Sequence, residues 1–337
     1  MSSIIEVDNL TKTFNGGVKA VREISFNVEA GEIFGFLGPN GAGKSTTIMM
    51  LTTLIAPTSG SAKVAGFDVV AQPAQVRLSL GYISQDLAVD DNLSGRENLF
   101  FQAGLYHLPK KTATERISEL LALVGLETRA DDAVETYSGG MRKRLDIAAG
   151  LIHHPKVLFL DEPTLGLDIQ TRHQIWRYID QLRKERNMTI FLTTHYMEEA
   201  DSLCDRIAII DQGVIKTIDS PEHLKNGVGA QIVSIRFDEQ DEDAVNRALA
   251  CIRDLDIVER VERQDGQCLA MVGNGDAAIA AIYHATHSSG LKINSVALKK
   301  PTLDDVYMAF TGKGLRNESG SRQSAHRAHM VLRRMRS

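Results

Sequence analysis

The sequence of 337 residues lacks several features that would assign it to a class of protein at once. It has three cysteines and no C-x-x-C pair, which argues against a disulfide framework or a zinc site and suits a reducing compartment. No apolar run approaches the roughly 18 residues of a membrane span. The N-terminus has no basic segment before a long apolar one, so we expect no signal peptide. At a membrane, another chain would have to supply the spans.

The charge balance and length set further limits. The net charge of −5 provides no overall basic field, so we expect no nucleic-acid partner. A hydrophobic content of 43% is enough for a sizeable core, and the length favours two domains. Residues 4–7 read as an edge strand and residues 21–29 as a second strand, so antiparallel strands are expected ahead of a parallel α/β core.

The strongest motif is a glycine-rich loop at residues 38–46, called the phosphate loop below, which matches G-x-x-x-x-G-K-[ST] in full. Residues 32–37 read as a buried strand before it, and residues 46–55 as a helix after it. This arrangement binds phosphate through backbone N–H groups and the positive end of the helix dipole. Lys44 adds a charge for the phosphate oxygens, and the Ser45 hydroxyl suits Mg²⁺. The alternative, a glycine-rich turn before a core helix, is disfavoured by the full match. The predicted nucleotide-binding residues of this loop are Gly38, Pro39, Asn40, Gly41, Ala42, Gly43, Lys44, Ser45 and Thr46.

Polar side chains end two other predicted strands. Residues 157–160 are apolar and lead into Asp161 and Glu162, and residues 187–194 lead into His195. Ligands bind at the carboxyl ends of parallel strands. We therefore expect Asp161 to hold Mg²⁺ through water, Glu162 to orient or deprotonate the attacking water, and His195 to sense a γ-phosphate. The alternatives are an acidic turn and a structural histidine.

A helical region separates these two groups of motifs. Apolar residues recur with a period near 3.6 from residue 94 to about residue 126, and Pro109 divides them into at least two helices. The Ser-Gly-Gly segment at residues 138–140, called the signature segment below, then opens another helix with Ser138 as the N-cap. Its backbone N–H groups would form a second anion site. By itself, this segment is better explained as a structural helix cap.

Together with Gln85 and Asp168, these motifs resemble in order and spacing those of ATP-binding cassette (ABC) ATPases. The resemblance covers about residues 4–225. It implies a P-loop NTPase core of α/β class, with an antiparallel β subdomain and a helical subdomain at about residues 86–150. It also implies a head-to-tail dimer, with a second copy or a related ATPase subunit. Each ATP would lie between the phosphate loop of one subunit and Ser138, Gly139 and Gly140 of the other.

The resemblance also implies roles for single residues. Gln85 would bind Mg²⁺ and couple to a membrane partner, so the implied metal-binding residues are Ser45, Gln85 and Asp161. Asp168 would cross the dimer interface. Phe14 would stack on adenine, at a position where the family more often has tyrosine. The implied catalytic residues are Lys44, Glu162 and His195.

One departure from the family narrows the expected function. The usual Leu-Ser-Gly-Gly-Gln is replaced by Tyr-Ser-Gly-Gly-Met at residues 137–141, followed by Arg-Lys-Arg-Leu-Asp. This form resembles exporters of the daunorubicin-resistance type. It implies Mg-ATP-driven export of drug-like or antibiotic-like cargo through a separate transmembrane permease, with this chain at the cytoplasmic face of the cell membrane.

Two alternatives remain open. A soluble ABC ATPase acting on ribosomes would usually carry two cassettes, and one acting on DNA would carry coiled-coil or zinc insertions. This chain has one phosphate loop and neither kind of insertion. A mononucleotide-binding regulatory module is disfavoured because both Glu162 and His195 are present.

The C-terminal part shows a different pattern. Residues 230–312 read as strand, helix, two strands, helix and strand, which predicts a small ferredoxin-like α+β domain after an ATP-binding domain at residues 1–225. A last helix is expected with Thr302 as its cap, and residues 301–312 resemble the closing motif of the daunorubicin-type ATPases. No catalytic group is evident there, so dimer support or regulation is expected. Residues 313–337 form a basic tail, expected to be disordered. The alternative is contact with anionic lipid or with cytoplasmic loops of the membrane partner.

Overall fold

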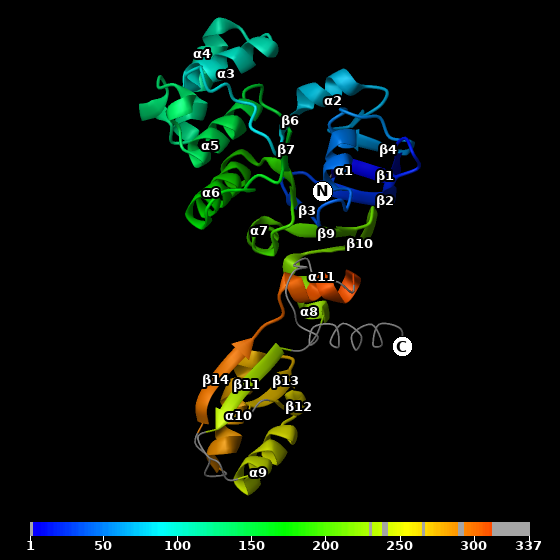
Figure 1. The fold of residues 1–337 in the computed structure, drawn as a ribbon, viewed down its shortest axis with the longest axis vertical. Coiled ribbons are helices and arrows are strands. Elements are labelled where there is room, and N and C mark those ends of the chain that lie inside the picture. Colours follow the sequence, from blue (N-terminus) through cyan, green and yellow to red (C-terminus); the bar gives the residue numbers. More distant parts are fainter. Residues whose placement is uncertain (1–2, 229–230, 238–241, 265–266, 289–292, 312–337) are drawn as a thin grey trace. The chain divides into compact units, whose positions relative to one another are not determined.

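The computed structural model describes residues 3–228, 231–237, 242–264, 267–288 and 293–311. The chain divides into two compact units, Met1–Pro221 and Glu222–Ser337, which are coloured along the sequence in Figure 1. The predicted basic tail at residues 313–337 lies outside the described residues. Within the described residues, no helix is long and apolar enough to cross a membrane.

The first unit begins with a four-stranded antiparallel sheet in the order β2-β1-β4-β5. Its strands are β1 (Ser3–Thr13), β2 (Lys19–Glu29), β4 (Ser59–Val64) and β5 (Phe67–Asp68). The predicted edge position of residues 4–7 is wrong, because β1 pairs with β2 on one side and with β4 on the other. The chain reaches β4 only after the phosphate loop and helix α1, and this distant pairing leaves no local mark in the sequence.

The second sheet of this unit has six strands in the order β10-β9-β3-β8-β7-β6. These strands are β3 (Ile33–Leu37), β6 (Leu80–Ile83), β7 (Val157–Asp161), β8 (Thr189–Thr194), β9 (Arg206–Asp211) and β10 (Val214–Asp219). All adjacent pairs are parallel except β9 with β10. Every residue of β3, β7 and β8 is buried, as expected for parallel strands that are covered on both faces.

An aromatic cluster joins the two sheets of the first unit. Phe26 of β2 stacks on Phe34 of β3 with ring centroids 5.5 Å apart, and Phe191 of β8 contacts both rings. These side chains belong to one continuous core that includes residues of both sheets. Burial of large rings stabilises this packing strongly. It fixes the sheet that carries the phosphate loop against the hairpin that carries Phe14.

Helices lie on either side of the parallel sheet. The helices of the first unit are α1 (Lys44–Leu51), α2 (Pro73–Ser79), α3 (Gly95–Leu105), α4 (Lys110–Leu123), α5 (Gly139–Gly150), α6 (Ile169–Arg186) and α7 (Met197–Leu203), with short 3₁₀ turns at Glu127–Arg129 and Val134–Thr136. Helix α8 (Pro221–Val228) begins at the boundary between the units and belongs, apart from Pro221, to the second. As predicted, Pro109 separates α3 from α4. Helix α1 ends four residues before the predicted end, because Thr53 has a left-handed backbone (φ 64°) that a helix cannot contain.

The second unit contains an antiparallel sheet in the order β12-β13-β11-β14. Its elements are β11 (Gln231–Phe237), α9 (Glu242–Arg253), β12 (Val258–Gln264), β13 (Gln267–Val272), α10 (Gly275–Ser288), β14 (Ile293–Lys299) and α11 (Leu303–Thr311). This is the predicted ferredoxin-like sequence of strands and helices. The predicted cap is also present, because the Thr302 hydroxyl accepts a hydrogen bond from the Asp305 amide.

Candidate functional site

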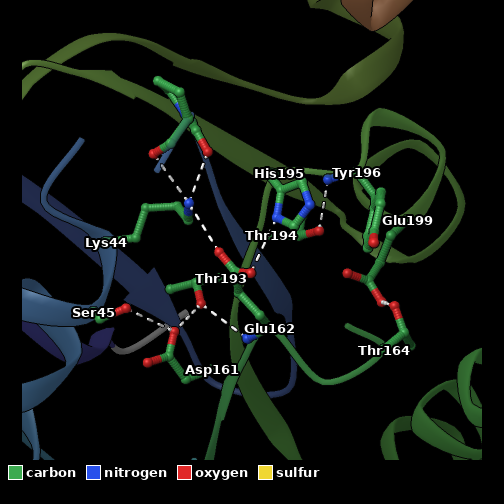
Figure 2. A network of polar contacts seen from close by, with 12 residues as sticks. Lys44, Ser45, Asp161, Glu162, Thr164, Thr193, Thr194, His195, Tyr196 and Glu199 are labelled. Atoms are coloured by element: carbon green, nitrogen blue, oxygen red, sulfur yellow. Dashed lines mark hydrogen bonds and ion pairs between the residues drawn. The ribbon is translucent and has the colours of Figure 1, made fainter. Parts of the chain in front are cut away.

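Three parallel strands end side by side and bring the predicted polar residues together. Leu37 at the end of β3 pairs with Thr194 of β8, and Asp161 at the end of β7 pairs with Thr193. The phosphate loop, the two carboxylates and His195 therefore leave the sheet at one edge. Figure 2 shows these side chains directed toward one another.

The backbone of the phosphate loop needs glycine at particular positions. Gly43 has φ 107°, and a Cβ atom there would lie 2.6 Å from the Ala20 carbonyl oxygen. A Cβ atom on Gly38 would lie 2.3 Å from the Ile210 carbonyl oxygen. The Gly38 amide donates to the Thr194 carbonyl at 3.2 Å. The loop is thus held between β2, β8 and β9, with its N–H groups available around the start of α1.

Lys44 occupies the centre of this loop. Its side chain is 4% exposed, and Nζ donates to the carbonyl oxygens of Gly38 at 2.8 Å and Pro39 at 3.2 Å. The same ammonium forms an ion pair with Glu162 Oε1 at 3.0 Å. The positive charge is therefore held at the loop by three oxygen atoms and directly contacts the predicted catalytic carboxylate.

Glu162 connects the phosphate loop to His195. Its second carboxylate oxygen, Oε2, lies 3.0 Å from His195 Nδ1. The Glu162 backbone is left-handed with φ 49°, and its amide is fixed by two bonds of 3.1 Å to the carbonyl and hydroxyl of Thr193. A non-glycine residue in this conformation is strained, and such strain is typical of functional sites. The strained backbone directs the carboxylate between Lys44 and His195.

Oxygen atoms surround the predicted metal position. Ser45 Oγ donates to Asp161 Oδ1 at 3.2 Å, and the Thr193 hydroxyl donates to the same oxygen. Burial and the Asp161 carboxylate raise the pKa of Tyr82 to about 12. No cluster of three or more His, Cys, Asp or Glu side chains suited to a metal occurs in the part of the chain that is described. A hydroxyl and one carboxylate fit Mg²⁺, which keeps several waters and is also bound by substrate phosphates.

Gln85 and Phe14 flank this group. Gln85 follows β6, whose Ile83 pairs with Leu160 of β7, so the exposed Gln85 side chain extends from the same sheet edge as Asp161. Phe14 is 41% exposed in the turn between β1 and β2, with Lys12 Nζ 5.4 Å from its ring centroid. Both predicted residues are therefore accessible to a ligand.

The signature segment is not brought to the phosphate loop of its own chain. Figure 1 shows α1 and α5 on opposite sides of strands β6 and β7. Ser138 caps α5 as predicted, with Met141 N donating to its hydroxyl at 3.3 Å. Ser138 and Gly139 are exposed. Nearby, Asp168 caps α6, and hydrogen bonds from Thr171 lower the pKa of its carboxyl.

The sequence did not predict the buried groups behind the strand ends. Thr193 contacts both Asp161 and Glu162. Glu199 is fully buried and accepts a hydrogen bond from Thr164 at 2.8 Å (Figure 2). It also accepts one from Trp176 at 2.9 Å. Burial raises the pKa of Glu199. The two threonines that end the apolar strand β8 could have indicated the role of Thr193. No sequence pattern distinguished the buried Glu199 from its exposed neighbour Glu198.

Family models match both units of the chain. Residues 21–165 match the ABC transporter family, and residues 220–311 match the C-terminal domain of ATP-binding proteins similar to DrrA1-3. The first match includes the phosphate loop, the signature segment and the carboxylates of Asp161 and Glu162 at the end of β7.

Curated relatives match across nearly the whole length. The chain is 39% identical to the daunorubicin/doxorubicin resistance ATP-binding protein DrrA of Streptomyces peucetius, over 91% of this chain and 92% of the relative. It is 35% identical to the linearmycin resistance ATP-binding protein LnrL of Bacillus subtilis, over 93% of this chain and all of the relative.

Solved structures match about two thirds of the chain. CbiO1 from Clostridium perfringens, part of the ABC transporter complex cbiONQ, aligns with a TM-score of 0.63 and 28% identity over 66% of this chain and 91% of that chain. The dimeric ATP-binding cassette MJ0796, in a post-hydrolysis state with ADP and phosphate, aligns with a TM-score of 0.57 and 25% identity over 64% of this chain and 98% of that chain. These matches confirm the predicted P-loop ABC fold. The chain therefore belongs to the ATP-binding subunits of ABC transporters, in the group with a DrrA-like C-terminal domain, and it is an ATPase.

Proposed function

We propose that two copies of this chain, or one copy and a related ATPase subunit, bind and hydrolyse Mg-ATP at a shared interface. One observation carries this proposal. The phosphate loop, Glu162 and His195 contact one another within one chain, whereas the exposed signature segment lies on the opposite side of β6 and β7. A second subunit placed head to tail supplies the missing half of each site.

The residues of the phosphate-loop half have distinct tasks. Lys44 exchanges its contacts with loop carbonyls for the β- and γ-phosphate oxygens, and the loop N–H groups bind the same phosphates. Glu162 orients the attacking water and accepts its proton. His195 holds the carboxylate through its 3.0 Å contact and reaches the γ-phosphate. Phe14 stacks on adenine with its exposed ring.

The metal-binding residues in this proposal are Ser45, Gln85 and Asp161. Bound Mg²⁺ would neutralise charge on the phosphate oxygens. Asp161 is kept in place by hydroxyl donors from Ser45 and Thr193. Gln85 extends from the neighbouring strand, so its amide oxygen can join the same site when the loop around it is fixed.

The other half of the site comes from the partner subunit. Ser138 caps the twelve-residue helix α5, and Gly139 and Gly140 are its first residues. Their hydroxyl and N–H groups therefore meet the γ-phosphate with the positive end of the helix dipole. Asp168 caps the adjacent helix α6 and crosses the interface. The Met at residue 141, where many relatives of the wider family have Gln, leaves these phosphate contacts unchanged.

We infer that this ATPase drives export through a separate transmembrane permease, from the cytoplasmic face of the cell membrane. The relatives named as resistance proteins for daunorubicin, doxorubicin and linearmycin favour drug-like or antibiotic-like cargo. They do not favour action on ribosomes or DNA. In this proposal residues 1–225 carry the ATP chemistry, and residues 230–312 support the dimer or regulate it.

A pull-down tests the transport assignment. The Glu162→Gln variant, held with Mg-ATP, is used to capture partners from detergent-solubilised membranes. Recovery of a polytopic membrane protein is the expected result, and the Lys44→Ala variant, which is expected to bind nucleotide more weakly, serves as a control. Recovery of ribosomes or nucleic acid instead would leave the ATP site intact and contradict the transport role.

A further inference from the structure

The loop that carries Gln85 is attached at both ends to the helix that carries the signature segment. Lys143 Nζ of α5 donates to the Ser84 carbonyl at 2.9 Å. One turn further along α5, Asp146 Oδ1 accepts from the Ala88 amide at 3.3 Å. These two contacts enclose Gln85 between them, and both come from the same face of one helix.

The two attaching side chains are themselves a buried ion pair. Lys143 Nζ lies 3.5 Å from Asp146 Oδ2, and the side chains are 6% and 4% exposed. Desolvation lowers the pKa of Lys143 and raises the pKa of Asp146. A buried pair of this kind is often no more stabilising than apolar side chains of similar volume. The ion pair therefore adds little to the stability of the fold. Its clearer effect is to hold residues 84–88 on α5.

The pair connects the Gln85 loop to the helix that carries the signature segment. Helix α5 begins after Ser138, so the signature segment, Lys143 and Asp146 are parts of one rigid element. At its other end, the pair holds the Ser84 carbonyl and the Ala88 amide on either side of Gln85.

We propose that Lys143 and Asp146 are positioning residues that attach residues 84–88 to α5 and so fix Gln85 relative to the signature segment. When the signature segment binds the ATP of a partner subunit and α5 moves, the two hydrogen bonds move Gln85 together with the helix. Conversely, a movement of residues 84–88 moves α5. This inference rests on the roles proposed above for Gln85 and the signature segment.

The test uses two double variants of the full chain, of which one removes both contacts to residues 84–88 and the other removes only one. Lys143→Met/Asp146→Leu removes both charges and both attachments while keeping apolar volume, so no buried charge is left unpaired. Lys143→Met/Asp146→Asn keeps an acceptor for the Ala88 amide and removes the attachment to Ser84. The matched control, Asp180→Asn/Lys184→Gln, removes an exposed ion pair of α6.

Two measurements separate positioning from a merely structural effect. Hydrogen exchange without nucleotide reports the protection of the Ala88 amide, and steady-state turnover against Mg²⁺ concentration reports the metal requirement. We expect the Met/Leu variant to keep its thermal unfolding midpoint, to lose protection at residue 88, and to need roughly tenfold more Mg²⁺ for half-maximal turnover. The Met/Asn variant should keep protection at residue 88 and show a smaller change in Mg²⁺ requirement. The control should change neither.

A Met/Leu variant with unchanged protection at residue 88 and an unchanged Mg²⁺ requirement would overturn the inference. The exchange measurement needs no ATP, so it reports the attachment even if the proposed dimeric ATP site proves wrong. If hydrogen exchange at residue 88 is unchanged in that variant while the dimer still hydrolyses ATP, the attachment is refuted and the proposed ATP site is not.

Discussion

The two units of this protein place their polar side chains in opposite ways. In the first unit, Lys44, Asp161, Glu162, Thr193 and Glu199 are buried at or behind the carboxyl ends of parallel strands. In the described residues of the second unit, Thr286 is the buried polar side chain, and its hydroxyl bonds to the Ile282 carbonyl of its own helix. The first unit thus buries polar groups that contact one another, and the second buries an almost purely apolar core.

The difference follows from strand direction. Parallel strands end at the same edge of a sheet, so residues that follow separate strands converge there. In the second unit, every strand pair is antiparallel, and successive strand ends are divided between two edges. Buried polar groups are tolerated only when they bond to one another or to a ligand. This contrast supports the proposal that the ATP chemistry belongs to the first unit.

The largest expected effect is the loss of turnover in Glu162→Gln. Glutamine keeps the volume and an oxygen for Lys44 but cannot accept a proton, so hydrolysis should fall by roughly 10²- to 10⁴-fold while ATP binding persists. Phosphate release and nucleotide binding are measured on the same preparation. Glu198→Gln, on the exposed face of α7, is the control and should retain full activity. Full activity in Glu162→Gln would remove the general-base role.

Lys44→Ala should act on binding instead of on the proton-transfer step. The variant loses a charge-assisted contact to phosphate worth about 1.5–3 kcal/mol, which corresponds to a roughly 10- to 100-fold weaker Kd for ATP. Titration with a fluorescent ATP analogue measures this change. Lys63→Ala removes an exposed lysine of β4 and should leave the affinity unchanged. Parent-like affinity in the Lys44 variant would contradict the assigned role of the phosphate loop.

A core substitution in the second unit tests its separation from the chemistry. Ile235→Val on β11 removes one buried methylene, and it should lower the free energy of unfolding of that unit by about 0.5–1.5 kcal/mol. Because Ile235 belongs to the core of the second unit, ATP hydrolysis should stay at the parent rate. Thermal unfolding and phosphate release are followed together. A large loss of ATP hydrolysis would contradict the proposal that the second unit does not take part in the chemistry.

The smallest effect is expected from Glu199→Gln and depends on pH. Burial raises the pKa of Glu199 above its ordinary value of 4.5, so the folded chain keeps this proton at pH values where the unfolded chain has released it. Stability from this group is therefore greatest below pH 4.5 and is lost as the pH rises through the folded-state pKa.

Glutamine keeps an oxygen for Thr164 and Trp176 but does not titrate. The stability of the parent relative to Glu199→Gln should therefore decrease from pH 4.5 upward, as measured by chemical unfolding at several pH values. Glu198→Gln again serves as the control, since Glu198 is exposed. A difference that is independent of pH would show that Glu199 is ionised equally in both states.

Much of this architecture was predictable because short-range patterns encode it. The phosphate loop, the strand ends at Asp161 and His195, and the cap at Ser138 were all predicted from local sequence. The inner position of β1 was not, because its pairing with β4 joins segments separated by the phosphate loop and α1. The contacts of Lys143, Asp146 and Glu199 were also missed. The residue type alone does not show whether a charged side chain is buried, because burial depends on the tertiary packing.

The central claim is that each ATP site uses residues of two subunits, and mixing two inactive variants tests it most directly. Lys44→Ala disables the phosphate loop. Gly139→Asp disables the signature segment by repelling phosphate, at an exposed helix N-terminus where an acidic side chain is accommodated. In an equal mixture, half of the dimers are mixed and each contains one intact site. We expect the mixture to recover about a quarter of the parent ATPase rate. No recovery from freely exchanging subunits would contradict it and place both halves of the site within one chain.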